Sequence, residues 1–243
     1  MFDPKSLLDQ VLGAGSSGAS GKAGSDDLMR RGRDLLSSQR GGLAVGGLAG
    51  LLLGTKTGRK LGKTAVTYGG LALVAGLAYR AYQDYQAGKQ GRIEPHRPTD
   101  ARGTDFRLEA PKGTGFDPAQ APGGEARVAT ALLSAMIAAA KADGHIDAEE
   151  QRRIFGKMDE AGLGADEKAF LMDELRAPLD MDKVVTLART PEEAAEIYAA
   201  SRLAIDPDHR AEKAYLDMLA ARLDLDPALV DEIEYAVREA ELS

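Results

Sequence analysis

The hydrophobic pattern of residues 124–243 has a helical period throughout. The run EARVATALLSAMIAAAKA (125–142) is apolar on nearly every side, which predicts a buried central helix. Later apolar stripes with helical spacing are Ala194/Ile197/Tyr198/Ser201, Tyr215/Leu216/Leu219/Leu223 and Leu229/Val230/Ile233/Ala236/Val237. Start signals precede two of them: the capping box Thr190-Pro191-Glu192-Glu193 and the pair Asp226-Pro227. Because no alternating strand pattern occurs, we predict an all-α domain of seven helices.

A short amphipathic helix is predicted at the beginning of the sequence. In MFDPKSLLDQVLG, Asp3 can cap the helix and Pro4 suits its first turn. The apolar stripe of this helix is formed by Leu7, Leu8, Val11 and Leu12. The segment lacks the basic region and cleavage site of a secretory signal. We interpret residues 1–40 as this helix followed by a flexible basic spacer.

Residues 41–87 form a glycine-rich apolar segment with a basic centre. The apolar runs 41–54 and 65–79 flank TKTGRKLGKT (55–64), and glycine recurs at every fourth position from Gly42 to Gly62. Such a ladder allows close helix packing in membranes, whereas each glycine costs a helix in water up to about 1 kcal/mol relative to alanine. The cations of the centre, Lys56, Arg59, Lys60 and Lys63, exclude one uninterrupted span.

Each apolar run, at about 1.5 Å per helical residue, is shorter than a hydrocarbon core of about 30 Å. We therefore expect a membrane-associated helical hairpin with its basic turn among lipid headgroups. A bent helix lying in the interface and a buried helical pair in a soluble protein are the alternatives. Residues 88–123 hold five of the ten prolines among glycines and charges, so we interpret them as a disordered linker.

Charge and composition divide the chain at the same place. The net charge is −7, but residues 1–123 hold 17 Lys+Arg against 11 Asp+Glu, and residues 124–243 hold 14 against 27. The absence of cysteine excludes disulfides, thiolate nucleophiles and Cys-based metal sites. No GxSxG, HExxH or phosphate-loop motif occurs, so we assign no catalytic residue. The basic residues lack interleaved aromatics, which favours anionic lipid over nucleic acid as their partner.

The acidic domain carries a weak internal repeat with an offset of 63 residues. AKADGHIDAEEQRRIF (140–155) aligns with LAIDPDHRAEKAYLDM (203–218), and each copy contains an acidic turn between helices. Candidate ligands for a divalent cation such as Ca²⁺, Mg²⁺ or Mn²⁺ are Asp143, Asp147 and Glu149 in the first turn, and Asp206, Asp208 and Glu212 in the second. The same carboxylates are natural helix caps, so both interpretations stay open.

The residues of these turns also carry a resemblance. DGHIDAEE (143–150), together with the seven-helix plan, resembles the TerB-like domain of tellurite-resistance proteins. The run ARTPEEAAEIYAASRLAIDPDHRAEKAYLDMLAARLDLDPALV (188–230) resembles the YebE-like family of bacterial inner-membrane proteins of unknown function. The resemblance implies a membrane-tethered helical domain that binds metal through Asp143, Asp147 and Glu149. In the second turn Pro207 replaces Gly144 and Arg210 replaces Asp147, so a second equivalent ion site is not implied.

The sequence therefore predicts a non-enzymatic membrane-associated protein that presents a TerB-like helical domain to an unidentified protein partner in envelope or stress physiology. We expect it at the bacterial inner membrane with residues 124–243 on the cytoplasmic side, because basic residues flank both apolar runs. The glycine-rich helix is the expected contact between copies of the chain. The alternatives are a metal-dependent hydrolase using the acidic turns and a soluble scaffold protein.

Overall fold

The computed structural model describes residues 2–12, 69–91, 108, 111–142, 163–205 and 210–242. Every regular element in these ranges is a helix, which confirms the all-α class. The helices are α1 (Pro4–Val11), α5 (Gly70–Lys89), α6 (Gly124–Ala140), α8 (Ala165–Arg176), α9 (Met181–Leu187), α10 (Pro191–Ala204), α11 (Arg210–Arg222) and α12 (Pro227–Leu242). The predicted stretch between α6 and α8 lies outside the described residues, so the count of seven helices is not tested.

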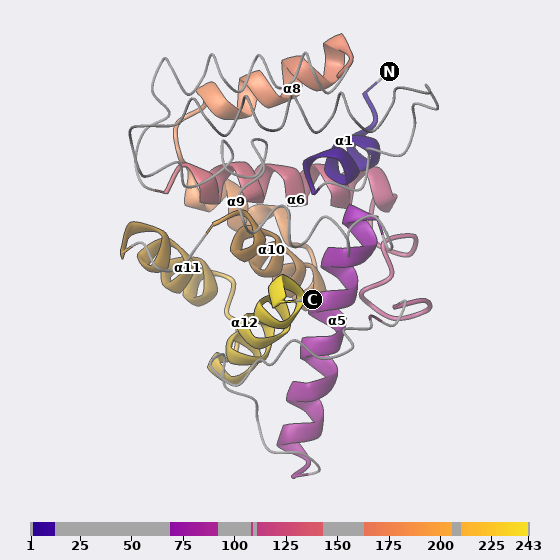
Figure 1. Cartoon of the computed structure of the whole chain (residues 1–243), viewed down its shortest axis with the longest axis vertical. Coiled ribbons are helices and arrows are strands. Elements are labelled where there is room, and N and C mark those ends of the chain that lie inside the picture. The colour runs from indigo at the N-terminus through magenta and orange to yellow at the C-terminus, as the bar shows by residue number, and fades with distance from the viewer. Residues whose placement is uncertain are drawn as a thin grey trace, which may run out of the picture.

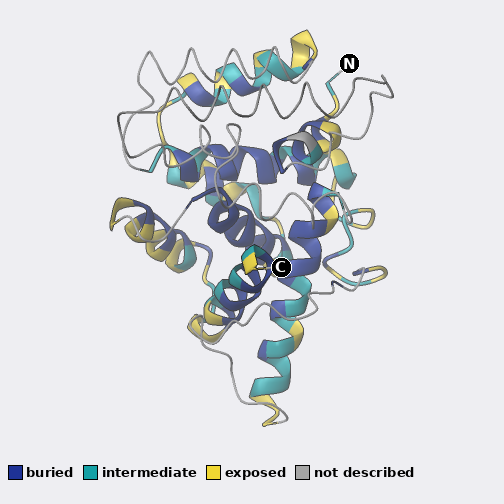
Figure 2. Ribbon diagram, viewed as in Figure 1, coloured by how far each residue is buried: buried dark blue, intermediate teal, exposed yellow. Residues whose placement is uncertain are grey.

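Two helices, α6 and α10, form the centre of the fold and share its most extensive helix–helix contact. The other helices surround them: α1, α8 and α9 lie along α6, and α5 and α12 pack on α10 (Figure 1). Burial follows this arrangement, because α6, α10 and the first half of α5 are buried along most of their length (Figure 2). The predicted buried central helix, residues 125–142, is thereby confirmed as α6.

The start signals read from the sequence operate as expected. Thr190 Oγ1 accepts a hydrogen bond from the backbone N–H of Glu193 at 3.2 Å, and Pro191 occupies the first turn of α10. Asp226 Oδ1 accepts from the backbone N–H of Ala228 at 3.0 Å, where α12 begins. Asp3 Oδ1 accepts from two backbone N–H groups in the first turn of α1. Each carboxylate or hydroxyl thus satisfies an otherwise unpaired helix-end donor.

The stripe predicted for the first helix is also confirmed. Its four apolar side chains are buried in the common core, and α1 packs on α6 and α5. The contact with α5 is unusually close: a Cβ on Gly70 would lie 2.8 Å from the backbone oxygen of Leu8. Gly70 N also donates to Asp9 Oδ1 at 2.5 Å. Glycine is needed here because α1 and α5 touch through their backbones.

Helix α5 corrects the prediction for the second apolar run, residues 65–79. We expected this run to face lipid as one arm of a hairpin, but from residue 70 onward the structure packs it against protein. Leu73, Val74 and Leu77 are fully buried, and α5 contacts α12, α10 and α1. The physical reason is that α12, α10 and α1 present enough apolar surface to cover the helix, which removes its need for lipid. The first apolar run and the basic centre, residues 41–64, lie outside the described residues.

The helices of the described ranges give no candidate for a membrane span, since none is both long enough and apolar enough to cross a bilayer.

Residues 111–123 correct a second expectation, that residues 88–123 are a disordered linker. They form consecutive turns against α5. Phe116 is buried there, with its ring centroid 5.8 Å from that of Tyr79 and 5.4 Å from that of Tyr82. This single aromatic side chain anchors the turns to the bundle.

Candidate functional site

The structure describes only one of the six predicted cation ligands. Asp143, Asp147, Glu149, Asp206 and Asp208 lie outside the described residues. Glu212 lies in the first turn of α11 and is 2% exposed. No group of three or more His, Asp or Glu side chains suited to a metal ion occurs within the described ranges. Cation binding by the acidic turns therefore stays a prediction.

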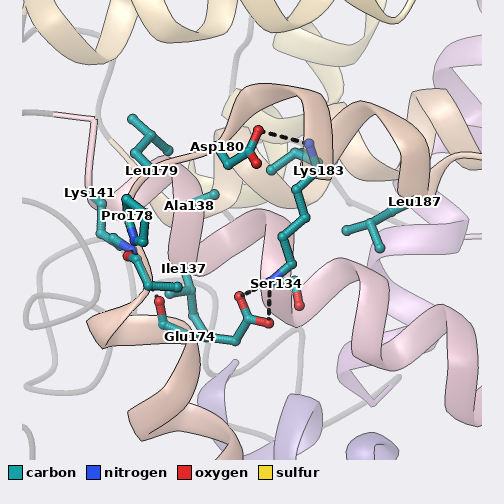
Figure 3. Close-up of a pocket in the computed structure, with 12 residues that line it drawn as sticks. Ser134, Ile137, Ala138, Lys141, Glu174, Pro178, Leu179, Asp180, Lys183 and Leu187 are labelled. Atoms are coloured by element: carbon teal, nitrogen blue, oxygen red, sulfur yellow. Dashed lines mark hydrogen bonds and ion pairs between the residues drawn. The ribbon is translucent and has the colours of Figure 1, made fainter.

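A small hollow lies between the C-terminal half of α6, the connection from α8 to α9, and α9 itself (Figure 3). We call it the α6–α9 hollow. Its walls are apolar, and Leu179 at its edge is one of the exposed large hydrophobic residues of the protein, at 42%. Its lining residues are Ser134, Ile137, Ala138, Lys141, Glu174, Ala177, Pro178, Leu179, Asp180, Lys183, Val184 and Leu187. The enclosed volume is about 20 Å³, room for about one water molecule and far below the roughly 300–1,000 Å³ of a small-molecule site.

The polar edge of the hollow holds its walls together. Lys141 Nζ donates to the carbonyl oxygens of Glu174, at 3.0 Å, and of Ala177. These carbonyls end α8, where a lysine complements the helix dipole. Burial lowers the pKa of Lys141, the charge of Glu174 opposes that effect, and the nearby Lys183 adds to it. Lys141 therefore acts as a cap that joins α6 to the end of α8.

Lys183 spans the hollow in Figure 3 and binds both oxygens of the Glu174 carboxylate, at 2.8 and 3.0 Å. Asp180 caps α9, since its Oδ1 accepts from the backbone N–H of Lys183 at 3.1 Å. The edge thus balances two ammonium groups with two carboxylates around an apolar centre. An apolar centre inside a polar rim is the usual anatomy of a protein–protein contact.

A second cluster of polar side chains lies between α6 and α10 and is more buried than the edge of the hollow. Arg127 Nη2 pairs with Glu193 Oε1, Arg127 Nε donates to the Pro122 carbonyl at 2.5 Å, and Nη1 donates to the Leu187 carbonyl at 3.3 Å. Glu193 Oε2 accepts from the backbone N–H of Arg189 at 2.9 Å. One guanidinium therefore connects α6 with the turns before it, the end of α9 and the start of α10. We call Arg127, Glu193 and the neighbouring Glu196 the Arg127 cluster.

A third network fixes α12 against the centre. Arg202 of α10 binds Glu234 Oε2 at 2.8 Å and Glu241 Oε1 at 3.1 Å. Tyr198 OH donates to Glu234 Oε1 at 2.9 Å, and burial together with that carboxylate raises the pKa of Tyr198. The side chain of Arg202 is 3% exposed, so the pair is part of the interior.

Neither buried network was predicted from the sequence. Glu193 was assigned only to a helix cap, and Arg127 and Arg202 were given no role. A sequence signal for these networks was available, because each arginine is a charged residue within a helix that is mostly apolar. In the structure, α10 buries nearly every residue it contains. A charge in such a helix must be paired, because an isolated buried ion is costly.

Comparison with known protein families identifies the family to which the chain belongs. A family model described as "Protein of unknown function (DUF533)" matches residues 38–237, more than half of the chain. The chain belongs to the DUF533 family. The DUF533 match includes α5, α6 and α10 together, so the Arg127 cluster and the α6–α9 hollow both fall inside it.

The DUF533 chain is also 34% identical over 112 residues to an "Uncharacterized protein in ampR 5′ region" of Yersinia enterocolitica. That alignment covers 46% of this chain and 81% of the relative. No solved structure matches the chain.

Proposed function

We propose that this DUF533 protein is a non-enzymatic interaction module whose TerB-like helical domain binds a protein partner at the α6–α9 hollow. The exposed Leu179 beside a preformed apolar hollow carries the proposal. The TerB-like assignment rests on the resemblance of DGHIDAEE and on the all-helical fold.

Because the hollow has room for about one water molecule, it accepts only the terminal methyl group of an apolar side chain from a partner protein, and the rest of that side chain would lie against the exposed Leu179. The walls are held before binding by the Lys141 cap and the Asp180 cap, so little conformational entropy is lost when they are covered. The rim pair Lys183–Glu174 is partly exposed and would set the orientation of the partner more than its affinity.

The experiment compares two equivalent substitutions at exposed leucines. Leu179→Ser alters the hollow, whereas Leu242→Ser alters a leucine of similar exposure at the end of α12. The tagged full chain is crosslinked in bacterial cells and the captured proteins are quantified. We expect a partner that the wild type and Leu242→Ser capture equally and that Leu179→Ser captures at least about tenfold less, the equivalent of about 1.4 kcal/mol. Equal capture by all three chains would refute the hollow as the contact.

We further propose that residues 41–63 attach the protein to the cytoplasmic face of the bacterial inner membrane and bring copies of the chain together. The support is the glycine ladder and its four cations, which share one helical face in the sequence. Because α5 belongs to the protein core, the informative deletion removes 41–63 and leaves α5 intact.

Flotation with vesicles containing an anionic phospholipid tests this attachment. The full chain should float, and both the deletion and a variant with the four cations replaced by glutamine should remain at the bottom of the gradient. Flotation of the deletion to the same extent as the full chain would contradict the proposal. Chemical crosslinking of the same samples measures self-association.

We also propose that the turn after α6 binds a divalent cation through Asp143, Asp147 and Glu149. The support is the acidic spacing and the resemblance to TerB-like domains. Calorimetric titration of the full chain with Ca²⁺, Mg²⁺ and Mn²⁺ should give binding heat that Asp143→Asn weakens. If no ion gives heat or raises the melting temperature, helix capping is the whole role of these carboxylates.

A further inference from the structure

Glu196 is an acidic residue buried in the interior of the protein, which the formation of α10 does not by itself require. It lies in the middle of α10 and faces α6 together with Arg127, Val128 and Ala131, with no room for a water molecule between them. The residue is 3% exposed, and its Oε1 meets no hydrogen-bond donor within the described part of the chain. A carboxyl group in such surroundings is much more stable protonated than ionised.

The charges near Glu196 do not offset the energetic cost of burying its ionised carboxylate. Glu193 and Glu192 of the same helix are both acidic, and the cation that acts on Glu196 within the described residues is Arg127 of α6. The donors of Arg127 already serve Glu193 and two backbone carbonyls. Burial is the main cause that raises the pKa of Glu196, to about 8, with Glu193 adding to it and Arg127 opposing it.

Several charged residues of the other helices packed on α10 form ion pairs or are buried. Arg80 of α5 binds Glu239 of α12 at 2.5 Å. Glu234 and Glu241 of α12 bind Arg202 on α10. Glu212 of α11 is itself buried. The charges that act on Glu196 within the described residues are therefore those of the Arg127 cluster and Glu192.

We propose that the contact between α6 and α10 is a proton-dependent latch, closed when Glu196 is protonated and loosened when it is ionised. Loss of the Glu196 proton to solvent leaves two buried carboxylates beside one guanidinium. Glu193 and Glu196 then compete for Arg127, and the guanidinium that connects α6 to the ends of α9 and α10 loses its fixed geometry. The latch needs no partner and no membrane, so it is independent of the proposed function.

The sign of the pH effect follows from the direction of the shift. The pKa of Glu196 is higher in the folded chain than the ordinary value of 4.5. The stabilisation from protonated Glu196 is therefore complete below pH 4.5, is lost as the pH rises toward about 8, and changes no further above that. Within this window one proton is released on unfolding, so the folding equilibrium constant falls by up to about tenfold per pH unit.

Thermal and urea unfolding of the full chain between about pH 5 and pH 9 tests the latch. We expect the wild type to lose stability across this range and Glu196→Gln, which is neutral at every pH, to lose much less. Glu192→Gln is the matched control, because it makes the same chemical change on the same helix at a residue that is not buried. It should keep most of the wild-type slope, since Glu192 has the smallest of the effects on Glu196. Equal slopes for the wild type and Glu196→Gln would overturn the proposal.

A second measurement uses the unaltered protein, in case Glu196→Gln does not fold. Infrared titration should detect a protonated carboxyl group that persists at neutral pH and is lost as the pH rises through about 8. Amide hydrogen exchange, corrected for the intrinsic effect of pH, should show α6 and α10 opening more readily over the same interval. A spectrum without any protonated carboxyl group at neutral pH would overturn the latch.

Discussion

Replacing Arg202 with methionine tests whether the buried ion pairs hold the helices together. Methionine keeps most of the side-chain volume and removes the charge. The substitution takes a cation away from Glu234, 2.8 Å from Arg202 Nε, and from Glu241, 3.1 Å from Nη1. It also removes the donor to the backbone oxygen of Ile205 at 3.2 Å.

The expected cost follows from burial. The Arg202 side chain is 3% exposed, and those of Glu234 and Glu241 are 15% and 20% exposed. Removing one partner of a buried pair leaves uncompensated charge and costs about 3–5 kcal/mol, a large part of a typical stability of about 5–15 kcal/mol. We therefore predict a loss of about 3–5 kcal/mol in the free energy of unfolding of Arg202→Met.

The matched control is Arg222→Met. Arg222 pairs with Asp182, but the two side chains are 47% and 74% exposed, so the pair is worth about 0–1 kcal/mol. Urea unfolding followed by circular dichroism at neutral pH measures both variants. Equal losses for the two arginines, or a loss below about 1 kcal/mol for Arg202→Met with an unchanged urea dependence, would refute the assignment of the buried network as a structural tie.

Three further substitutions test the packing around α5 and the hollow. Leu77→Ala should cost about 2–5 kcal/mol in urea unfolding because it opens a cavity in the core, whereas Leu242→Ala at an exposed site should cost under about 0.5 kcal/mol. Gly70→Ala should cost about 1–3 kcal/mol and increase amide exchange in α1, since the added methyl group meets the α1 backbone. Lys141→Met should cost about 1–3 kcal/mol and increase exchange at the end of α8, while Lys183→Met, on the exposed rim, should change stability little. Similar values for each variant and its control, or no change in Gly70→Ala, would contradict these contacts.

Local signals in the sequence predicted the helices that can be compared with the structure. The stripes of α1, α10 and α12 and the caps at Asp3, Thr190 and Asp226 all occur as expected. The reason is that capping and amphipathic spacing act within one or two turns of the chain. α6 was recognised as central because it is apolar on nearly every side.

The partner of an apolar helix could not be predicted in this way. The run that contains α5 is apolar enough for lipid or for a protein core, and its composition does not distinguish them. The decisive contacts come from α1 and α12, far away in the sequence. The Arg127 cluster escaped prediction for the same reason: Arg127 and Glu193 are 66 residues apart, and only folding brings them together.

Amide hydrogen exchange of the full chain without lipid shows directly whether α5 belongs to the protein core. We predict that amides from Leu73 to Ala81 are protected to a similar degree as those of α6 and α10, and that anionic vesicles leave this protection unchanged. Rapid exchange of these amides in the absence of lipid, with protection only after vesicles are added, would contradict it.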